Sequence, residues 1–207
     1  MSDLPPIAKG AEAEILASSF LGRDALIKKR SPKRYRKAEL DDWLRSSRIR
    51  NEARLMREAR KAGVRTPAVY SIDLKEFSIT MERVRGEIVK EKLDRDPDSA
   101  KEICRKIGDA VAILHNHKIC HGDLTTSNMI LTEDGDICLI DLSMGKTKAE
   151  LEDIGVDMHL LERAFASAHP ALGDSFSELM ESYLTVKKEP KELLKKMEEI
   201  KNRGRYT

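Results

Sequence analysis

Apolar and polar positions alternate in short stretches through the first thirty residues of the chain. Residues 5–30 are therefore expected to form strands and turns, and residues 25–28 make a short strand that closes on Lys28. Between 38 and 62, apolar residues recur at about every 3.6 positions, which predicts a long helix that Gly63 ends. The apolar positions of this helix are Leu40, Leu44, Leu55, Met56 and Ala59.

A second group of strands follows the helix. Residues 69–72 and 77–81 have the pattern of two strands in a hairpin, and the polar connector 82–86 comes after them. We expect this connector to separate two lobes. The N-terminal lobe would comprise residues 1–84 and the C-terminal lobe residues 85–207.

The rest of the chain is predominantly helical. Residues 100–117 predict an amphipathic helix with apolar residues on one face. Two short strands at 129–131 and 137–140 are joined by a turn that contains Asp-Gly, the signature of a hairpin. From residue 148 onward, the pattern is mostly that of helices.

The composition limits what kind of protein this is. Charged residues make up 36% of the chain and aromatic residues only 4%, so the core must consist of aliphatic side chains. The net charge of +2 predicts no general affinity for nucleic acid, although local patches still count. No apolar run approaches the roughly 18 residues of a membrane span, and no signal peptide is evident. Cys104, Cys120 and Cys138 show no metal-ligand spacing and are expected to be buried in a reducing cytoplasm.

The most informative stretch is 121–130, with the sequence HGDLTTSNMI. Asp123 is followed by Asn128 and then, at the end of an apolar run, by Asp141. Phosphoryl transfer needs one carboxylate near the attacking hydroxyl, and an amide and a second carboxylate to hold Mg²⁺ on the nucleotide phosphates. The pattern therefore predicts Asp123 as the catalytic residue and Asn128 and Asp141 as metal ligands. The alternative is a polar turn between strands, but the flanking apolar runs and a matching upstream element favour the site.

That upstream element consists of a lysine and an acid. Lys28 closes a strand shortly after a Gly-containing turn, where a cation for the nucleotide phosphates belongs. Glu52 lies on the following helix and is placed to pair with Lys28. Alternatively, both are ordinary solvated side chains in a basic region. The loop 9–15 has a single glycine, a weak signal for nucleotide, and we expect it to cover the nucleotide without clasping the phosphates tightly.

Several motifs occur in an order that resembles a known family. They are Gly10-Ala11-Glu12-Ala13-Glu14-Ile15, Ile27-Lys28-Lys29-Arg30, Lys33-Arg34-Tyr35-Arg36, Arg48-Ile49-Arg50-Asn51-Glu52-Ala53, the stretch 121–128, and Arg203-Gly204-Arg205. Together they resemble the kinase of the KEOPS complex, also called the PRPK family of small atypical kinases. The resemblance covers nearly the whole chain. It implies an α+β, two-lobed protein-kinase-like fold with a reduced helical C-terminal lobe, and it implies ATP and Mg²⁺ as cofactors.

The resemblance also implies roles for individual residues. Lys28 would contact the phosphates, Glu52 would hold Lys28, and Asp123 would be the proton acceptor or would orient water. Asn128 and Asp141 would bind Mg²⁺. Backbone groups of Glu82 and Val84 would read the adenine edge. The other implied nucleotide contacts are Ile7, Lys9, Gly10, Ala11, Glu12, Ala13, Ile15, Met81 and Ile140.

The same resemblance implies partners. They are the threonylcarbamoyl-transferase subunit that modifies adenosine 37 of tRNA, the other subunits of the complex, and tRNA itself, reached through the complex and the basic tail 202–207. We expect this tail to be mobile in the isolated chain. The implied activity is that of an ATPase and serine/threonine kinase. Two alternatives are a tRNA-binding scaffold with a structural nucleotide pocket, which the basic segment 28–65 supports, and a RIO-like or small-molecule phosphotransferase.

Some kinase features are missing from the sequence. Gly122 stands before Asp123 where many protein kinases have Arg, and only 66 residues follow Asp141, with no Ala-Pro-Glu segment. These absences suggest water or a residue of a nearby partner as the phosphoryl acceptor. Asp157 is either a buttress of the catalytic loop or an ordinary carboxylate near the start of a helix, and the sequence does not decide between the two. We expect His121 to support the loop by hydrogen bonding.

Overall fold

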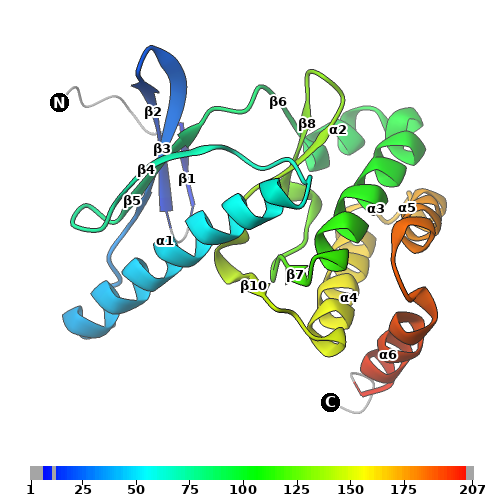
Figure 1. Cartoon of the computed structure of the whole chain (residues 1–207). Helices are drawn as coiled ribbons and strands as arrows, with labels where there is room; N and C mark the ends of the chain where they lie inside the picture. Colours follow the sequence, from blue (N-terminus) through cyan, green and yellow to red (C-terminus); the bar gives the residue numbers. More distant parts are fainter. Residues whose placement is uncertain (1–6, 11–12, 204–207) are drawn as a thin grey trace.

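A computed structural model of the chain describes residues 7–10 and 13–203. Its N-terminal part is an antiparallel five-stranded sheet in the order β1-β2-β3-β5-β4 (Figure 1). Leu21 and Gly22 both have positive φ in the tight turn between β2 and β3, a geometry that suits the twist of a hairpin. The strands are β1 (Ala8–Lys9), β2 (Ala13–Phe20), β3 (Arg23–Arg30), β4 (Val69–Asp73) and β5 (Ser78–Glu82).

The long helix α1 (Ala38–Lys61) joins β3 to β4 and runs between the sheet and the rest of the molecule. Its apolar contacts with the core begin at Ile49, near the middle of the helix, and continue through Leu55. Leu40, one of the apolar positions in the period that predicted the helix, does not face the core and is 51% exposed. The first turns of α1 project beyond the sheet in Figure 1, so no layer lies there to cover Leu40.

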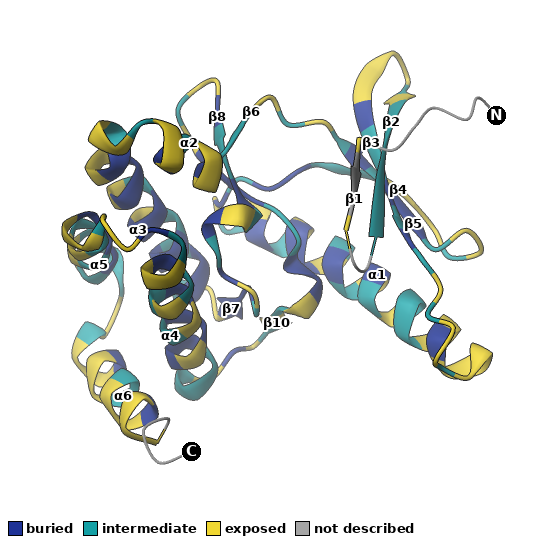
Figure 2. Ribbon diagram, turned by 180° about the vertical axis from the view of Figure 1, so that it is seen from behind, coloured by how far each residue is buried: buried dark blue, intermediate teal, exposed yellow. Residues whose placement is uncertain are grey.

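The C-terminal part is mainly helical, with two small sheets in the orders β6-β8-β9 and β10-β7. Buried residues concentrate on the inner faces of its helices (Figure 2). Gly108 lets α3 and α5 approach closely, because an added Cβ would lie 2.4 Å from the carbonyl oxygen of Leu179. The helices are α2 (Val89–Arg95), α3 (Ala100–Asn116), α4 (Leu151–Ala168), α5 (Gly173–Val186) and α6 (Pro190–Arg203), and the strands are β6 (Gly86–Ile88), β7 (Ile119–Cys120), β8 (Met129–Thr132), β9 (Ile137–Leu139) and β10 (Lys146–Thr147).

The predicted α+β, two-lobed fold is confirmed, with a sheet-rich lobe and a helical lobe. The apolar pattern missed α2 and the two- or three-residue strands β6, β7 and β10, because elements this short show no clear period. The boundary between residues 84 and 85 stays a prediction; it falls in the connector between β5 and β6. Burial raises the pKa of Cys104, Cys120 and Cys138 to about 12 each, as expected for buried thiols.

The C-terminal tail begins later than the sequence suggested. Asn202 and Arg203 belong to the last turn of α6, and the Arg203 guanidinium forms an ion pair with Glu152 of α4. Residues 204–207 lie outside the described part of the chain. Among the described helices, none combines the length and apolar character needed to cross a membrane.

Candidate active site

A cleft of about 890 Å³ lies between the two lobes, within the size range of ligand pockets in proteins. Ile7 is exposed and does not line this cleft. The side chain of Lys9 and the whole of Ala11 and Glu12 lie outside the described part of the chain. The other predicted site residues all line the cleft: Gly10, Ala13, Ile15, Lys28, Glu52, Met81, Glu82, Val84, Asp123, Asn128, Ile140 and Asp141.

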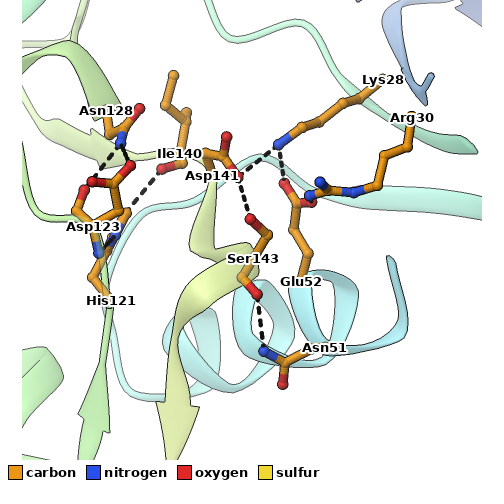
Figure 3. A network of polar contacts seen from close by, with 10 residues as sticks. All are labelled: Lys28, Arg30, Asn51, Glu52, His121, Asp123, Asn128, Ile140, Asp141 and Ser143. Atoms are coloured by element: carbon orange, nitrogen blue, oxygen red, sulfur yellow. Dashed lines mark hydrogen bonds and ion pairs between the residues drawn. The ribbon is translucent and has the colours of Figure 1, made fainter. Parts of the chain in front are cut away.

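Lys28 occupies the centre of a network of charges (Figure 3). Its Nζ lies 2.6 Å from Oε1 of Glu52 on α1 and 2.7 Å from Oδ1 of Asp141 in the other lobe. Arg30 reaches the second oxygen of Glu52 at 2.8 Å. The expected ion pair between Lys28 of β3 and Glu52 of α1 is therefore present, and both of its side chains are buried. The network also ties the N-terminal sheet to the segment that carries Asp141.

Asp141 is held as a carboxylate by its surroundings. Burial raises the pKa of Asp141, but Lys28, Ser143 and Arg30 together outweigh burial, and the net pKa lies below its usual value. The hydroxyl of Ser143 donates a hydrogen bond of 2.8 Å to Oδ1 of Asp141. Asp141 itself has a left-handed backbone, with φ 58° and ψ 56°. This unusual conformation for a residue other than glycine re-aims the chain at the end of β9, toward the cleft.

The Lys28–Glu52 pair gives a stability prediction. Replacing Glu52 by Ala would leave Lys28 and Arg30 buried without this carboxylate, and we expect a loss of about 3–5 kcal/mol in the free energy of unfolding. Denaturant titration of both proteins measures the loss. The matched control is Glu76→Ala, which removes the partner of Lys29 in an exposed pair and should change little. Equal, small effects of the two substitutions would show that the buried pair does not stabilise the fold.

The catalytic loop brings Asp123 and Asn128 together. The amide nitrogen of Asn128 donates hydrogen bonds of 2.9 Å to both the backbone oxygen and Oδ2 of Asp123. This orientation leaves the oxygen of the Asn128 amide available to a cation. Asp123 is exposed to the cleft, as a group that acts on an incoming nucleophile must be.

Asp157 of α4 holds the backbone of this loop by hydrogen bonds. Its two carboxylate oxygens accept hydrogen bonds from the backbone N–H groups of His121, at 2.6 Å, and Gly122, at 2.9 Å. Burial raises the pKa of Asp157, but the hydrogen bonds and charges of His115 and His121 together outweigh burial, so the pKa is lowered overall. The sequence left the role of Asp157 open. The structure shows it as the buttress, because it lies in the second turn of α4 and caps no helix end.

His121 links the loop to the strand that precedes Asp141. Its Nε2 lies 2.9 Å from the carbonyl oxygen of Ile140, and its Nδ1 lies 3.3 Å from the backbone nitrogen of Asp123. Burial lowers the pKa of His121, which favours the neutral ring. Because Nδ1 accepts from the Asp123 N–H, the ring proton is on Nε2 and is donated to Ile140. This fits the supporting role that the sequence predicted.

The fold also explains the glycine that precedes Asp123. Gly122 has φ +80°, and an added Cβ would lie 2.3 Å from the carbonyl oxygen of Met144. Neither Arg nor any other side chain fits at this position unless the segment after Asp141 moves. That segment is fixed from the other lobe, because Asn51 of α1 donates hydrogen bonds to the carbonyl oxygens of Ser143 and Gly145.

Sequence reasoning overlooked several residues of the cleft. Arg30 and Arg48 line the cleft together with Glu52, and Ser143 contacts Asp141. Arg30 had a signal, since it lies two residues after Lys28 and so points to the same side of β3. The other cleft residues that were missed are Leu26, Pro67, Ile88, Gly122, Ser127, Ile130 and Met144.

Comparisons with known proteins agree with this geometry. Residues 22–167 match the protein kinase domain family. The KEOPS complex subunit Bud32 of Pyrococcus abyssi is 40% identical, over 97% of this chain and 95% of that protein. The chain belongs to the Bud32 family of protein kinases. A mouse member, the EKC/KEOPS complex subunit Tp53rkb, is 34% identical over 99% of this chain and 88% of that protein.

Other members of the Bud32 family are parts of longer proteins. A probable bifunctional tRNA threonylcarbamoyladenosine biosynthesis protein of Methanothermobacter thermautotrophicus is 43% identical over 99% of this chain, which spans only 38% of that protein. Among solved structures, the Rio2 kinase of Chaetomium thermophilum in complex with ADP, Mg²⁺ and phosphoaspartate has a TM-score of 0.64 at 16% identity. It covers 98% of this chain and 71% of that one, and at this identity it supports the fold alone.

Proposed function

We propose that this chain binds ATP with Mg²⁺ and acts as a phosphotransferase within a KEOPS complex, in support of the threonylcarbamoyladenosine modification of tRNA. The observation that carries the proposal is the meeting of Lys28, Asp123, Asn128 and Asp141 around one cleft. Membership of the Bud32 family supplies the complex, and the names of the longer relatives supply the tRNA modification.

The donor set of the cleft fits magnesium. The carboxylate of Asp141 and the amide oxygen of Asn128 are hard oxygen donors, and Mg²⁺ is usually held by one or two such groups with water and phosphate oxygens completing its shell. A cluster of three or more His, Cys, Asp or Glu side chains is absent from the described residues, and a site of this kind requires none. Bound Mg²⁺ would neutralise charge on the nucleotide phosphates.

Each residue of the chain then has a defined task. Lys28, held by Glu52, would bind the phosphates as a point charge. Asp123 would accept the proton of the attacking group or orient water, while Asn128 fixes the carboxylate of Asp123 through its amide N–H. Glu82 and Val84 lie where the sheet meets the connector, and their backbone groups would contact adenine.

The activity we favour is ATP hydrolysis with weak self-phosphorylation as a serine/threonine kinase. Asp123 opens directly to the cleft, and the segment after Asp141 is short and tied to α1 by Asn51. Water or a residue of the neighbouring threonylcarbamoyl-transferase subunit is then the nearest acceptor. Cytoplasmic location and a tRNA contact through the tail 202–207 stay predictions of the sequence.

ATP turnover tests the proposal. Phosphate release is measured for the purified chain alone, with tRNA, and with its threonylcarbamoyl-transferase partner, each with Mg²⁺ and with EDTA. We expect low turnover that needs Mg²⁺ and rises with the partner or with tRNA. A folded chain that shows no turnover in any mixture would instead support the alternative of a tRNA-binding scaffold.

A further inference from the structure

A second groove lies on the opposite side of α1 from the nucleotide cleft. It has a volume of about 690 Å³ and is lined by the second half of α1, by Pro67 and Ala68 before β4, and by Val69, Ser71 and Ile72 of β4. Arg50 and Arg54 are each two residues from Glu52, so they point about 200° around the helix from it. The groove and the cleft share Pro67, but none of the cations of the groove lines the cleft.

Positive charge lines this groove. Its described lining includes five exposed cations and no carboxylate: Arg50, Arg54, Arg57, Arg60 and Lys61. Arg57 and Lys61 share a contact with a single neighbouring acid, Glu58. Among the described residues, Arg54 bonds to the neutral Asn51 and Arg60 to a backbone oxygen. Within the described residues, the side chain of Arg50 has no recorded partner.

The cations form a regular row. Arg50, Arg54, Arg57 and Lys61 are spaced by four, three and four residues, so they follow one face of α1. At a rise of about 1.5 Å per residue the row spans about 16 Å. A strand of duplex DNA carries one phosphate per about 3.4 Å of helix axis, so about five phosphates lie along a row of this length. Arginine guanidinium groups also match phosphate oxygens in a bidentate geometry.

We propose that this groove binds the phosphate backbone of RNA. Interfaces between proteins are enriched in aromatic residues as well as in Arg, whereas protein–nucleic acid interfaces carry much more positive charge overall. The described lining has five cations and no aromatic ring, which favours nucleic acid over a protein partner. The choice of RNA over DNA rests on the proposed function in tRNA modification. Because the row is independent of Asp123 and Asp141, it would bind RNA whether or not the cleft turns over ATP.

The test compares RNA binding by variants of the full chain. The variants are Arg50→Gln, Arg54→Gln and Arg57→Gln combined, and the corresponding triple change to Glu. Affinity for a tRNA transcript is measured without ATP over a range of salt. We expect the Gln variant to bind about tenfold more weakly or worse, and the slope of log K against log salt to become shallower by about two to three. The matched control for the Glu variant is Lys101→Glu, Arg163→Glu and Lys191→Glu, which makes the same charge change at exposed sites on α3, α4 and α6.

Each outcome is decisive. Loss of affinity and of salt dependence in the groove variants but not in the control supports the proposal. Equal losses in the groove and control variants, or no loss in the groove variants, would overturn it. A duplex DNA of similar length and poly-glutamate serve as competitors, and a groove that prefers either of them over tRNA would also overturn it. Since ATP is absent, failure of the ATP turnover test leaves this result standing, and the two proposals fail independently.

Discussion

Replacing Asp141 by Ala should abolish Mg²⁺-dependent ATP turnover in a chain that still folds. The Asp141 carboxylate lines the cleft and lies 2.7 Å from the phosphate-binding Lys28, whereas the other acid beside Lys28, Glu52, is already paired with Arg30 as well. The remaining donor, Asn128, is a neutral amide and holds a divalent cation poorly alone. A bound metal contributes several kcal/mol to the transition state of phosphoryl transfer, so we expect a rate loss of about a thousandfold or more.

Phosphate release with and without Mg²⁺ measures this effect, and thermal unfolding verifies the fold. Both Asp141→Ala and Asp141→Asn remove a negative charge beside Lys28 and Arg30. Asp141→Asn keeps the size and shape of the side chain, so it separates the loss of charge from the loss of packing. The matched control is Asp24→Ala, an exposed carboxylate of β3 outside the cleft. Near-normal turnover in folded Asp141→Ala protein would refute the assignment of the site.

Replacing Asp123 by Ala should spare nucleotide binding and remove most of the catalysis. The Asp123 carboxylate accepts a hydrogen bond from Asn128 and is exposed to the cleft. Within the described residues, Asp123 makes no contact with the phosphate-binding Lys28. A positioned acid–base group contributes about 10²- to 10⁴-fold to rate. We therefore expect turnover to fall by about a hundredfold or more, with nucleotide affinity nearly unchanged.

Calorimetry of ATP binding and a turnover assay on the same preparation separate the two effects. Asp123→Asn is the informative companion, because it keeps a polar group beside Asn128 but cannot accept a proton. It should be as inactive as the Ala variant. If nucleotide affinity instead falls as sharply as turnover, Asp123 is a metal ligand or a fold residue, and the proposed mechanism must change.

Local sequence alone determined the parts of this protein that depend on neighbouring residues. The Asp-Gly turn and its flanking apolar runs predicted β8 and β9, and the structure places them as a hairpin. The spacing of Asp123, Asn128 and Asp141 predicted one site, because a single tight loop and the end of the next strand hold all three residues. The motif order also indicated the family correctly.

The long helix shows where local pattern stops being sufficient. The apolar period predicted the bounds of α1 to within one residue, but it did not indicate which turns of the helix are buried by other parts of the protein. Burial depends on what lies opposite a helix face, and nothing described covers Leu40 or Trp43, which is 65% exposed. The same limit applies to the basic segment 28–65, whose sequence did not reveal that four of its arginines, Arg50, Arg54, Arg57 and Arg60, line one groove.

Only the tertiary structure decided how the site is held together. Asp157 was ambiguous in the sequence because its partners, the N–H groups of His121 and Gly122, lie 36 and 35 residues away. The need for Gly122 arises from Met144, on a different segment, which leaves no room for a side chain. Sequence patterns record the periods of single helices and strands, whereas the distance between two such elements follows from the packing of the whole chain.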